Sequence, residues 1–191
     1  MPREGYQEDL AELREDVLYM SEVVLDRVRM GLDALNRKDE QTAREVIDGD
    51  DEINQLYLEL ERECVDLIAL QQPVAGDLRF IAASFKILTD LERIADLAVN
   101  LGEYTFEADR DAYPGVDVQS IGDDVVEMVE DAMTAYETDD SALCAALAER
   151  DDEIDRRCAE ASDVVVRDLI ERQVDVEVGD EDIEELMNDV S

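Results

Sequence analysis

The stretch DLRFIAASFKILTDLERIADLAVNL, residues 77–101, contains no proline or glycine and has apolar side chains at helical spacing. Two neighbouring registers of positions seven apart are apolar except for one acid: Ile81, Leu88, Ala95 and Gly102 form the first, and Leu78, Phe85, Glu92 and Val99 form the second. Registers of this kind form the buried seam of a helix in a bundle. The stretch therefore predicts a long amphipathic helix over about residues 75–108.

The rest of the chain also indicates helices, separated by the two internal prolines, Pro73 and Pro114. The alternating β-branched pattern of strands is missing. Asp39 and Ser120 are the expected N-caps, and residues 110–119 form the expected linker. The expected helices cover about 7–37, 40–71, 75–108, 120–137 and 140–172, with a sixth from about 180 to the end of the sequence.

An internal repeat supports this layout. Residues 32–54 (LDALNRKDEQTAREVIDGDDEIN) align without gaps on residues 133–155 (MTAYETDDSALCAALAERDDEID), at an offset of 101. We therefore expect an all-α protein of two repeated, antiparallel three-helix bundles. The expected domains are residues 1–110 and 118–191. Under the same offset, the second copy of 77–101 would mostly fall after residue 191, so the second bundle is expected to be incomplete at the C-terminus.

The chain is strongly acidic, with 54 acidic and 17 basic residues and a formal net charge of −37. Hydrophobic residues make up 46%, which argues against disorder. Because only two of the basic residues are lysines, we expect an extreme halophile, whose salt-rich cytosol screens the charge. The acidity argues against nucleic acid and anionic lipid as partners. The sequence has neither an 18-residue apolar run nor a signal-peptide h-region, so we expect a cytoplasmic protein without membrane insertion.

Two residue types limit the chemistry. Histidine is absent, which removes histidine general bases, phosphorelay histidines and most zinc sites. The three cysteines, Cys64, Cys144 and Cys158, lack metal-site spacing, and their odd number argues against a closed set of disulfides. Because all three occupy seam positions, we expect them to be small buried core residues.

Acidic residues interrupt three of the apolar seams, and each has an oxygen ligand one helical turn later. The pairs are Asp50 with Asn54, Glu92 with Asp96, and Asp151 with Asp155. Spacing of four residues places both groups of a pair on one helix face. Two such pairs from facing helices would offer the oxygen ligands that Mg²⁺, Mn²⁺ and iron accept. The alternative for so acidic a chain is a solvated groove edge or buried pairing with arginine.

Three cations recur at intervals of seven on the helix of residues 77–101: Arg79, Lys86 and Arg93. Each follows a seam position by one residue, so the three share a helix face. They either bridge to acids of the preceding helix, such as Glu59 and Glu63, or present a surface to an anion or an acidic partner. Exposed ion pairs contribute only about 0–1 kcal/mol each, so stability is a weak reason for three in register.

Residues 71–101, QQPVAGDLRFIAASFKILTDLERIADLAVNL, resemble the central signature of the PhoU family, the accessory regulators of phosphate uptake. The family pattern is Pro, Ala and Asp-Leu-Arg, then Lys-Ile, then Asp-Leu-Glu-Arg-Ile-Gly-Asp. The matching residues are Pro73, Ala75, Asp77, Leu78, Arg79, Lys86, Ile87, Asp90, Leu91, Glu92, Arg93, Ile94 and Asp96. Ala95 replaces the usual glycine, a mild change within a helix. The similarity extends over roughly residues 10–175 and includes the run DGDDEIN.

The resemblance implies two three-helix bundles whose acidic motifs bind multinuclear clusters of iron or zinc. The positions that match these motifs are Asp50, Asn54, Glu92 and Asp96 in the first bundle, and Asp151 and Asp155 in the second. The partner motif of the second bundle, another Asp-Leu-Glu-Arg stretch, is not in this sequence. We expect a metal cluster of iron, zinc or manganese and no organic cofactor.

The resemblance also implies that Asp77, Arg79, Lys86 and Arg93 belong to a family surface for a partner or an anion. The implied function is negative regulation of phosphate import by a protein that contacts the ATPase of the phosphate transporter and, in bacteria, a sensor histidine kinase. Family members often form homodimers and are not thought to be enzymes. Two alternatives stay open: a structural dimerisation module without metal, and a carboxylate-bridged metal enzyme. The absence of histidine weighs against the enzyme, because di-iron bundles use Glu-x-x-His.

Overall fold

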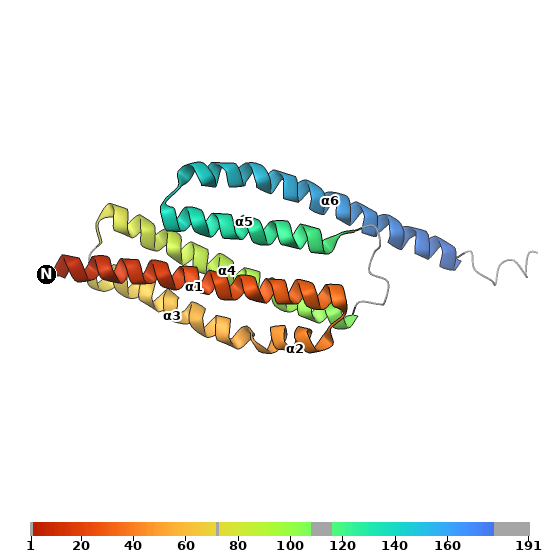
Figure 1. Cartoon of the computed structure of the whole chain (residues 1–191), viewed down its shortest axis with the longest axis horizontal. Coiled ribbons are helices and arrows are strands. Elements are labelled where there is room, and N and C mark those ends of the chain that lie inside the picture. The colour runs from red at the N-terminus through yellow and green to blue at the C-terminus, as the bar shows by residue number, and fades with distance from the viewer. Residues whose placement is uncertain (1, 72, 108–115, 178–191) are drawn as a thin grey trace, which may run out of the picture.

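The computed structural model describes residues 2–71, 73–107 and 116–177, and every regular element in these ranges is a helix (Figure 1). The helices are α1 (Pro2–Arg37), α2 (Glu40–Asp48), α3 (Asp50–Gln71), α4 (Ala75–Glu107), α5 (Val118–Thr138) and α6 (Ser141–Glu177). α1 begins before residue 7 and α6 continues beyond residue 172, so both are longer than the sequence predicted. The helix predicted from residue 180 lies outside the described residues. None of the described helices is long and apolar enough to cross a bilayer.

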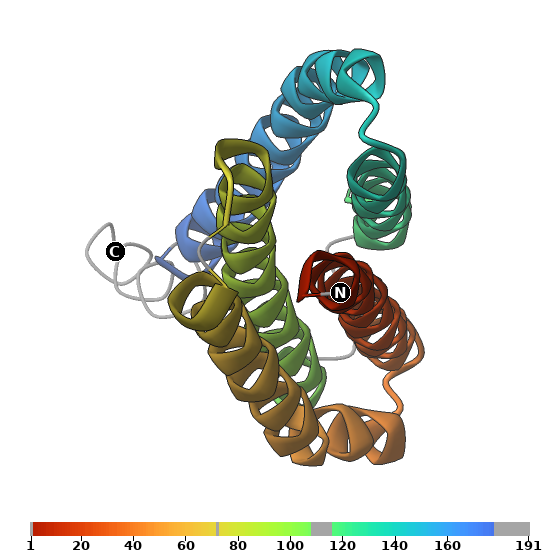
Figure 2. The same cartoon turned by 90° about the vertical axis from the view of Figure 1, so that its left-hand side faces the viewer.

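The first bundle consists of α1, α3 and α4, which pack lengthwise around one core, with the short α2 at one end (Figure 2). α1 and α4 share the most extensive contact. Side chains from all four helices are almost fully buried: Leu13, Val17, Met20, Val24, Val46, Ile53, Ile81, Leu88 and Leu91. Burial of each large aliphatic side chain contributes about 1.5–3 kcal/mol, so this core is the main source of stability.

One of the two seams predicted on α4 is correct, because Ile81, Leu88, Ala95 and Gly102 are buried. α2 and α3 bury a similar register of positions seven apart: Val46, Ile53, Leu60 and Leu67. The second register predicted on α4 is wrong: Leu78 and Phe85 are exposed, and Ser84, Leu91, Ala98 and Thr105 are buried in its place. α4 turns this face toward α1, its most extensive neighbour, which moves the buried register by one residue. Glu92 therefore lies at the edge of the core.

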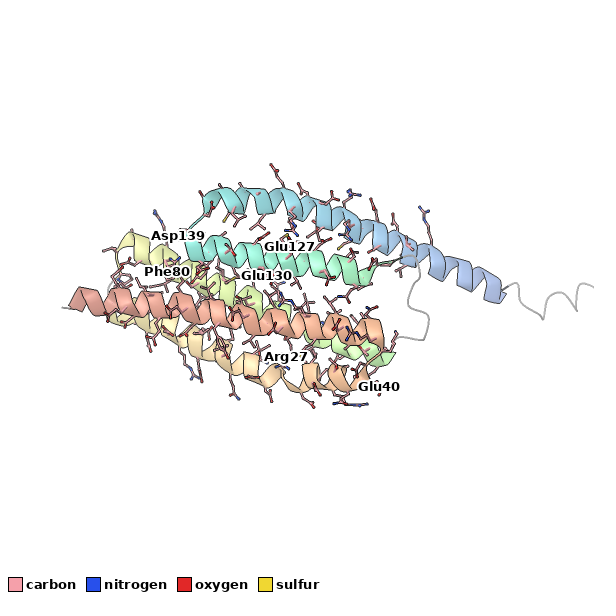
Figure 3. The ribbon with its side chains drawn as sticks, viewed as in Figure 1. Arg27, Glu40, Phe80, Glu127, Glu130 and Asp139 are labelled. Carbon is pink, nitrogen blue, oxygen red and sulfur yellow. The ribbon has the colours of Figure 1, made fainter. Side chains whose placement is uncertain are left out.

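The second predicted helix is in fact two, because Gly49 separates α2 from α3. Arg27 of α1 fills the break (Figure 3): its Nη1 donates to the carbonyl oxygen of Glu45 at 2.9 Å, and its Nη2 pairs with Glu52 at 3.5 Å. A Cβ at position 49 would displace this guanidinium, so the position of Arg27 in the structure depends on the glycine. The break makes Asp50 the first residue of α3.

The internal repeat is confirmed at the α1–α2 and α5–α6 turns. Lys38 and its match Asp139 both adopt left-handed backbone conformations, with φ of 56° and 54°. The next residues, Asp39 and Asp140, cap the following helices. Each accepts hydrogen bonds from the backbone N–H groups two and three positions later, at 2.9–3.3 Å. The same local pattern therefore makes the same turn twice, and the predicted cap at Asp39 is confirmed.

α5 lies along α1, and α6 packs on α5 alone among the described elements. Asp117 caps α5 by accepting a hydrogen bond from the backbone N–H of Ser120 at 2.9 Å, so the prediction of Ser120 as the cap is wrong. With a single neighbour, α6 leaves Cys144 and Cys158 exposed, which contradicts their predicted burial. Cys64 in the first bundle is buried as predicted, and burial raises the pKa of its thiol to about 11.

Candidate carboxylate site and docking surface

The surface between α3 and α4 brings together the two acid pairs predicted for the first bundle. α3 contributes Asp50 and Asn54, and Asn54 donates from Nδ2 to Asp50 Oδ2 at 2.7 Å. α4 contributes Glu92 and Asp96, and the charge of Asp96 acts on both Asp50 and Glu92. These helices run in opposite directions from the connection at residues 73 and 74, which is why pairs so far apart in sequence meet.

Burial and mutual repulsion shape the titration of these carboxyl groups. The pKa of Asp50 is raised first by burial and then by the charge of Asp96, and the hydrogen bond from Asn54 offsets part of this rise. The pKa of Glu92 is raised first by burial, then by Asp96 and then by Asp50. Carboxylates that repel one another in this way favour the uptake of a proton or a cation.

The donor chemistry of these four residues suits a hard cation, but their side chains do not converge on one point. Among the residues that the structure describes, no three Asp, Glu or Cys side chains are grouped so that they could hold a metal ion. Asn54 turns its amide nitrogen toward Asp50. Metal binding would require Asn54 to present its oxygen and the three carboxylates to move together, so the predicted metal cluster stays a prediction.

The two acids predicted for the second bundle lie apart from this site. Asp151 and Asp155 are exposed on α6, which has only α5 as a neighbour in the described chain. Asp151 borders a shallow hollow of about 280 Å³ between α5 and α6, whose other lining residues are Met128, Val129, Ala132, Leu147 and Ala148. Within the described residues, neither Asp151 nor Asp155 belongs to a group of three acids or cysteines that could hold a metal ion.

The cationic stripe of α4 is exposed and is not used to hold the bundle together. Arg79 and Lys86 form no hydrogen bond or ion pair with the described part of the chain. Arg93 pairs with Asp90 of its own helix at 3.7 Å, and both side chains are largely exposed. Among the described residues, this stripe therefore forms no bridge to α3, a possibility that the sequence left open.

The acids that such bridges would have used face α1. Glu59 and Glu63 line a hollow of about 380 Å³ together with residues of α1. The pKa of Glu63 is raised first by burial and then by the charges of acids on α1. Asp77, which the sequence grouped with the stripe, also interacts with α1: the pKa of Tyr6 is raised first by burial and then by the charge of Asp77.

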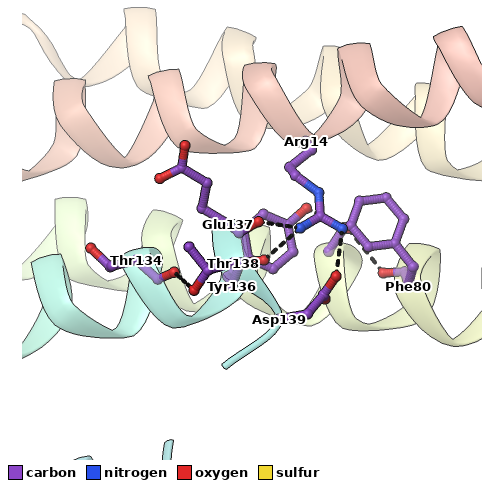
Figure 4. A network of polar contacts seen from close by, with 8 residues as sticks. Arg14, Phe80, Thr134, Tyr136, Glu137, Thr138 and Asp139 are labelled. Carbon is purple, nitrogen blue, oxygen red and sulfur yellow. Dashed lines mark hydrogen bonds and ion pairs between the residues drawn. The ribbon is translucent and has the colours of Figure 1, made fainter. Parts of the chain in front are cut away.

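Arg14 joins α1, α4 and α5 in a contact that the sequence did not predict (Figure 4). Its guanidinium lies 4.7 Å from the ring centroid of Phe80 and 5.5 Å from that of Tyr136, and the two rings stack with centroids 5.7 Å apart. Nη1 donates to the carbonyl oxygens of Tyr136 and Glu137 at the end of α5, and Nη2 pairs with Asp139 at 3.4 Å. The sequence signal is weak, a single arginine beside a seam position.

Comparison with known proteins assigns the chain to a family. A model of the PhoU domain matches residues 17–105 and 118–188. A PhoU homologue of Aquifex aeolicus, named a phosphate-specific transport system accessory protein, is 37% identical over 149 residues, which are 77% of this chain and 67% of that protein. The crystal structure of PhoU from Pseudomonas aeruginosa superposes with a TM-score of 0.83 at 30% identity, covering 90% of this chain and 84% of the other.

A second solved structure agrees with the first. The phosphate transport system regulatory protein PhoU from Streptococcus pneumoniae superposes with a TM-score of 0.79 at 25% identity, covering 84% of this chain and 77% of the other. The match of the family model extends over both repeats and includes the signature helix α4. This chain therefore belongs to the PhoU family.

Proposed function

We propose that this protein is a negative regulator of phosphate uptake that acts as an adaptor on the phosphate transporter complex. Family membership supports the proposal, as do the names of two relatives, an accessory protein and a regulatory protein of phosphate transport. The observation that carries it is the exposure of unpaired cations on the signature helix α4. Its cations Arg79 and Lys86 are exposed and unpaired with the described chain, so the fold does not explain them.

The proposed partner is the ATPase subunit of the phosphate transporter, with a phosphate-sensing kinase as a further partner. In this proposal the protein works in the salt-rich cytoplasm of a halophile, as a homodimer and without catalysis. Its strong negative charge fits such a medium, because the Debye length is only about 3 Å at 1 M salt.

Phosphate uptake in cells that lack the gene tests the regulatory role. We expect uptake in phosphate-rich medium to rise several-fold without the gene, and to return to its former rate when the wild-type chain is expressed. Copurification with the transporter ATPase tests the docking step. Unchanged uptake together with no copurification would overturn the proposal.

We propose in addition that Asp50, Asn54, Glu92 and Asp96 bind iron, zinc or manganese, and that Asp151 and Asp155 serve a second site. The closeness of the first four residues and the raised pKa values of Asp50 and Glu92 support the first site. For the second site the support is the repeat alone, since these acids match Asp50 and Asn54 at the offset of 101.

Elemental analysis of protein purified in high salt without chelator tests the metal sites. Glu92→Ala/Asp96→Ala is expected to lose the metal of the first site, and Asp151→Ala/Asp155→Ala is the matched control from the second repeat. Loss in the first variant alone would support one site on α3 and α4. Absence of metal from the wild type would overturn both sites and favour a structural docking module.

A further inference from the structure

The α3–α4 hairpin carries an unusual share of the exposed apolar surface. Thirteen large apolar side chains are exposed in the described residues, and nine of them lie on this hairpin. Leu97, Tyr104 and Phe106 lie in the last part of α4. We call the other six the hairpin patch: Leu58, Val65, Ile68, Val74, Leu78 and Phe85. Clusters of exposed apolar side chains on a soluble protein mark sites of interaction, whereas single ones need no explanation.

Helix geometry places the patch on one side of the hairpin. Ile68 follows Asp50 by 18 residues, and Leu78 precedes Asp96 by 18 residues. Eighteen residues are about five helical turns, so Ile68 shares a helix face with Asp50, and Leu78 with Asp96. Because Asp50 and Asp96 interact between α3 and α4, Ile68 and Leu78 lie along the same side, toward the connection.

Spacings of three and seven residues place other members of the patch on nearby faces of the same two helices. Leu58 and Val65 are seven residues apart on α3, and Leu78 and Phe85 are seven apart on α4. Val74 lies in the connection between the two helices. The surface between α3 and α4 is therefore apolar near the connection and acidic at its far end.

Two cations without partners border the patch. Arg79 follows Leu78 and Lys86 follows Phe85, and neither is paired with the described part of the chain. Nine other arginines have carboxylate partners, whereas Arg62 and Arg167 have none among the described residues: the nine are Arg14, Arg27, Arg29, Arg37, Arg44, Arg93, Arg150, Arg156 and Arg157. Arg79 and Lys86, two helical turns apart on one face, are therefore available for carboxylates of another molecule.

No other described element covers this surface. α6 packs on α5, and α5 reaches α4 through Tyr136, which stacks on Phe80 and hydrogen-bonds to Ser84. Phe80 and Ser84 lie on the opposite side of α4 from Leu78 and Phe85. In Figure 2, α3 lies on the side of α4 that is turned away from α5. The patch is therefore open to a partner in the described part of the protein.

We propose that the hairpin patch, with Arg79 and Lys86, docks an amphipathic helix of a partner protein whose apolar face is flanked by carboxylates. The inference rests on the proposed adaptor function, because it names the surface with which the protein holds the transporter complex. The apolar side chains would supply the buried centre of the interface, and the two cations would pair with the acids at its rim. A protein partner is favoured over an anionic membrane, because only Arg79 and Lys86 border the patch, whereas surfaces that bind anionic lipid carry clusters of about four to eight cations.

Binding of the full-length protein to the detergent-purified phosphate transporter complex tests the inference. The apolar variant is Val65→Ser/Leu78→Ser and the charge variant is Arg79→Glu/Lys86→Glu. All four positions are exposed, so the melting temperature of the free protein is expected to change little. We expect at least tenfold weaker binding for both variants.

Matched controls come from outside the patch. Leu97→Ser changes an even more exposed apolar side chain of α4, and Arg37→Glu changes an exposed cation of α1. Both controls are expected to bind like the wild type. Equal binding by the patch variants and the wild type would overturn the inference and leave the adaptor function standing.

Three further outcomes would also overturn it. Absence of binding by the wild type would remove the adaptor function and the inference together. Binding of the wild type, but not of the charge variant, to vesicles containing anionic phosphatidylglycerol would assign the patch to a membrane surface. A change from dimer to monomer in the patch variants alone, measured by light scattering, would assign it to a second copy of this chain.

Discussion

The first bundle and the α5–α6 hairpin repeat one sequence pattern, yet the first bundle buries more of its positions. The matched positions are Ala43 and Cys144, Val46 and Leu147, Leu60 and Ala161, and Cys64 and Val165. The first member of each pair is buried, and the second is half-buried or exposed. α3 lies against both α1 and α4, whereas α6 has α5 as its one neighbour in the described chain. An apolar seam is therefore buried more completely where helices cover it from both sides.

The two repeats also differ in which helix supplies an arginine at one matched position. Gly49 matches Arg150 at the offset of 101. In the first bundle, Arg27 reaches from α1 into the helix break at Gly49. In the second repeat the helix is unbroken, and Arg150 reaches out to α5, where it pairs with Glu127 at 2.6 Å and Asp131 at 3.0 Å. A guanidinium occupies the helix interface in both cases, but it comes from the opposite helix.

The largest expected difference between the repeats is the cost of emptying a matched core position. Ile53 and Ile154 are the same residue type at matched positions, 1% and 7% exposed. Ile53→Ala should lower the free energy of unfolding by about 2–5 kcal/mol, because it leaves a closed cavity. Ile154→Ala should cost about 1–2 kcal/mol, because its site is covered from one side only. Urea unfolding at one high salt concentration measures both, and equal costs would contradict the comparison.

The helix break at Gly49 should be the next most sensitive feature. Gly49→Ala would displace the Arg27 guanidinium from the Glu45 carbonyl oxygen and from Glu52, and should destabilise the fold by about 1–3 kcal/mol through these lost contacts. Gly76→Ala is the matched control, because a Cβ at Gly76 meets no atom within 4 Å, and it should be neutral or slightly stabilising. Thermal unfolding measures both variants. If Arg27→Ala does not relieve the cost of Gly49→Ala, the displacement of Arg27 is not its cause.

Loss of the Arg14 contact between the two repeats should have a smaller effect on stability. Arg14→Ala removes the cation–π contact with Phe80 and the hydrogen bonds to the last carbonyl groups of α5. We expect a loss of about 1–2 kcal/mol, with faster amide hydrogen exchange in α5 than in α3. Arg37→Ala, which removes an exposed ion pair with Asp33, serves as the control. Uniform acceleration of exchange over both helices would show that Arg14 stabilises the whole fold rather than the link.

Features set by local chemistry were predictable from the sequence, and features set by the orientation of a neighbour were not. Asp39 was recognisable as a cap, because capping depends on the next three residues. The register of Leu78 and Phe85 was wrong by one residue, because the direction in which α4 faces α1 is not a local property. Arg14 was missed because its acceptor at Tyr136 is 122 positions away.

The candidate site shows the same division. The spacing of Asp50 with Asn54 and of Glu92 with Asp96 was sufficient to place each pair on one helix face. The apolar patch beside them was not predicted, because Leu78 and Phe85 were assigned to the core. Gly49 was the available signal for the helix break, since a glycine inside a predicted helix is unfavourable by about 1 kcal/mol relative to alanine. The sequence does not indicate that Arg27 occupies the space left by that glycine.

The smallest expected effect is electrostatic and belongs to the first bundle alone. The pKa of Glu92 is raised in the folded state by burial and by Asp96 and Asp50. Between the unfolded pKa, about 4.3, and this raised value the folded state binds more protons, so stability falls as the pH rises through that window. Glu92→Gln should therefore raise the unfolding midpoint of chelator-treated protein at pH 7, and the gain should vanish below about pH 4.

Glu103→Gln, which changes an exposed acid of the same helix, is the control for this pH effect. Chelation matters because a bound cation would reverse the sign: it would stabilise the ionised Glu92, and its loss would then destabilise the variant. If Glu92→Gln is less stable than the wild type before chelation and more stable after it, a bound metal ion neutralises the carboxylates that otherwise repel one another. A variant less stable under both conditions would show that Glu92 supports the fold through its packing, and that its repulsion by Asp50 and Asp96 is too weak to matter.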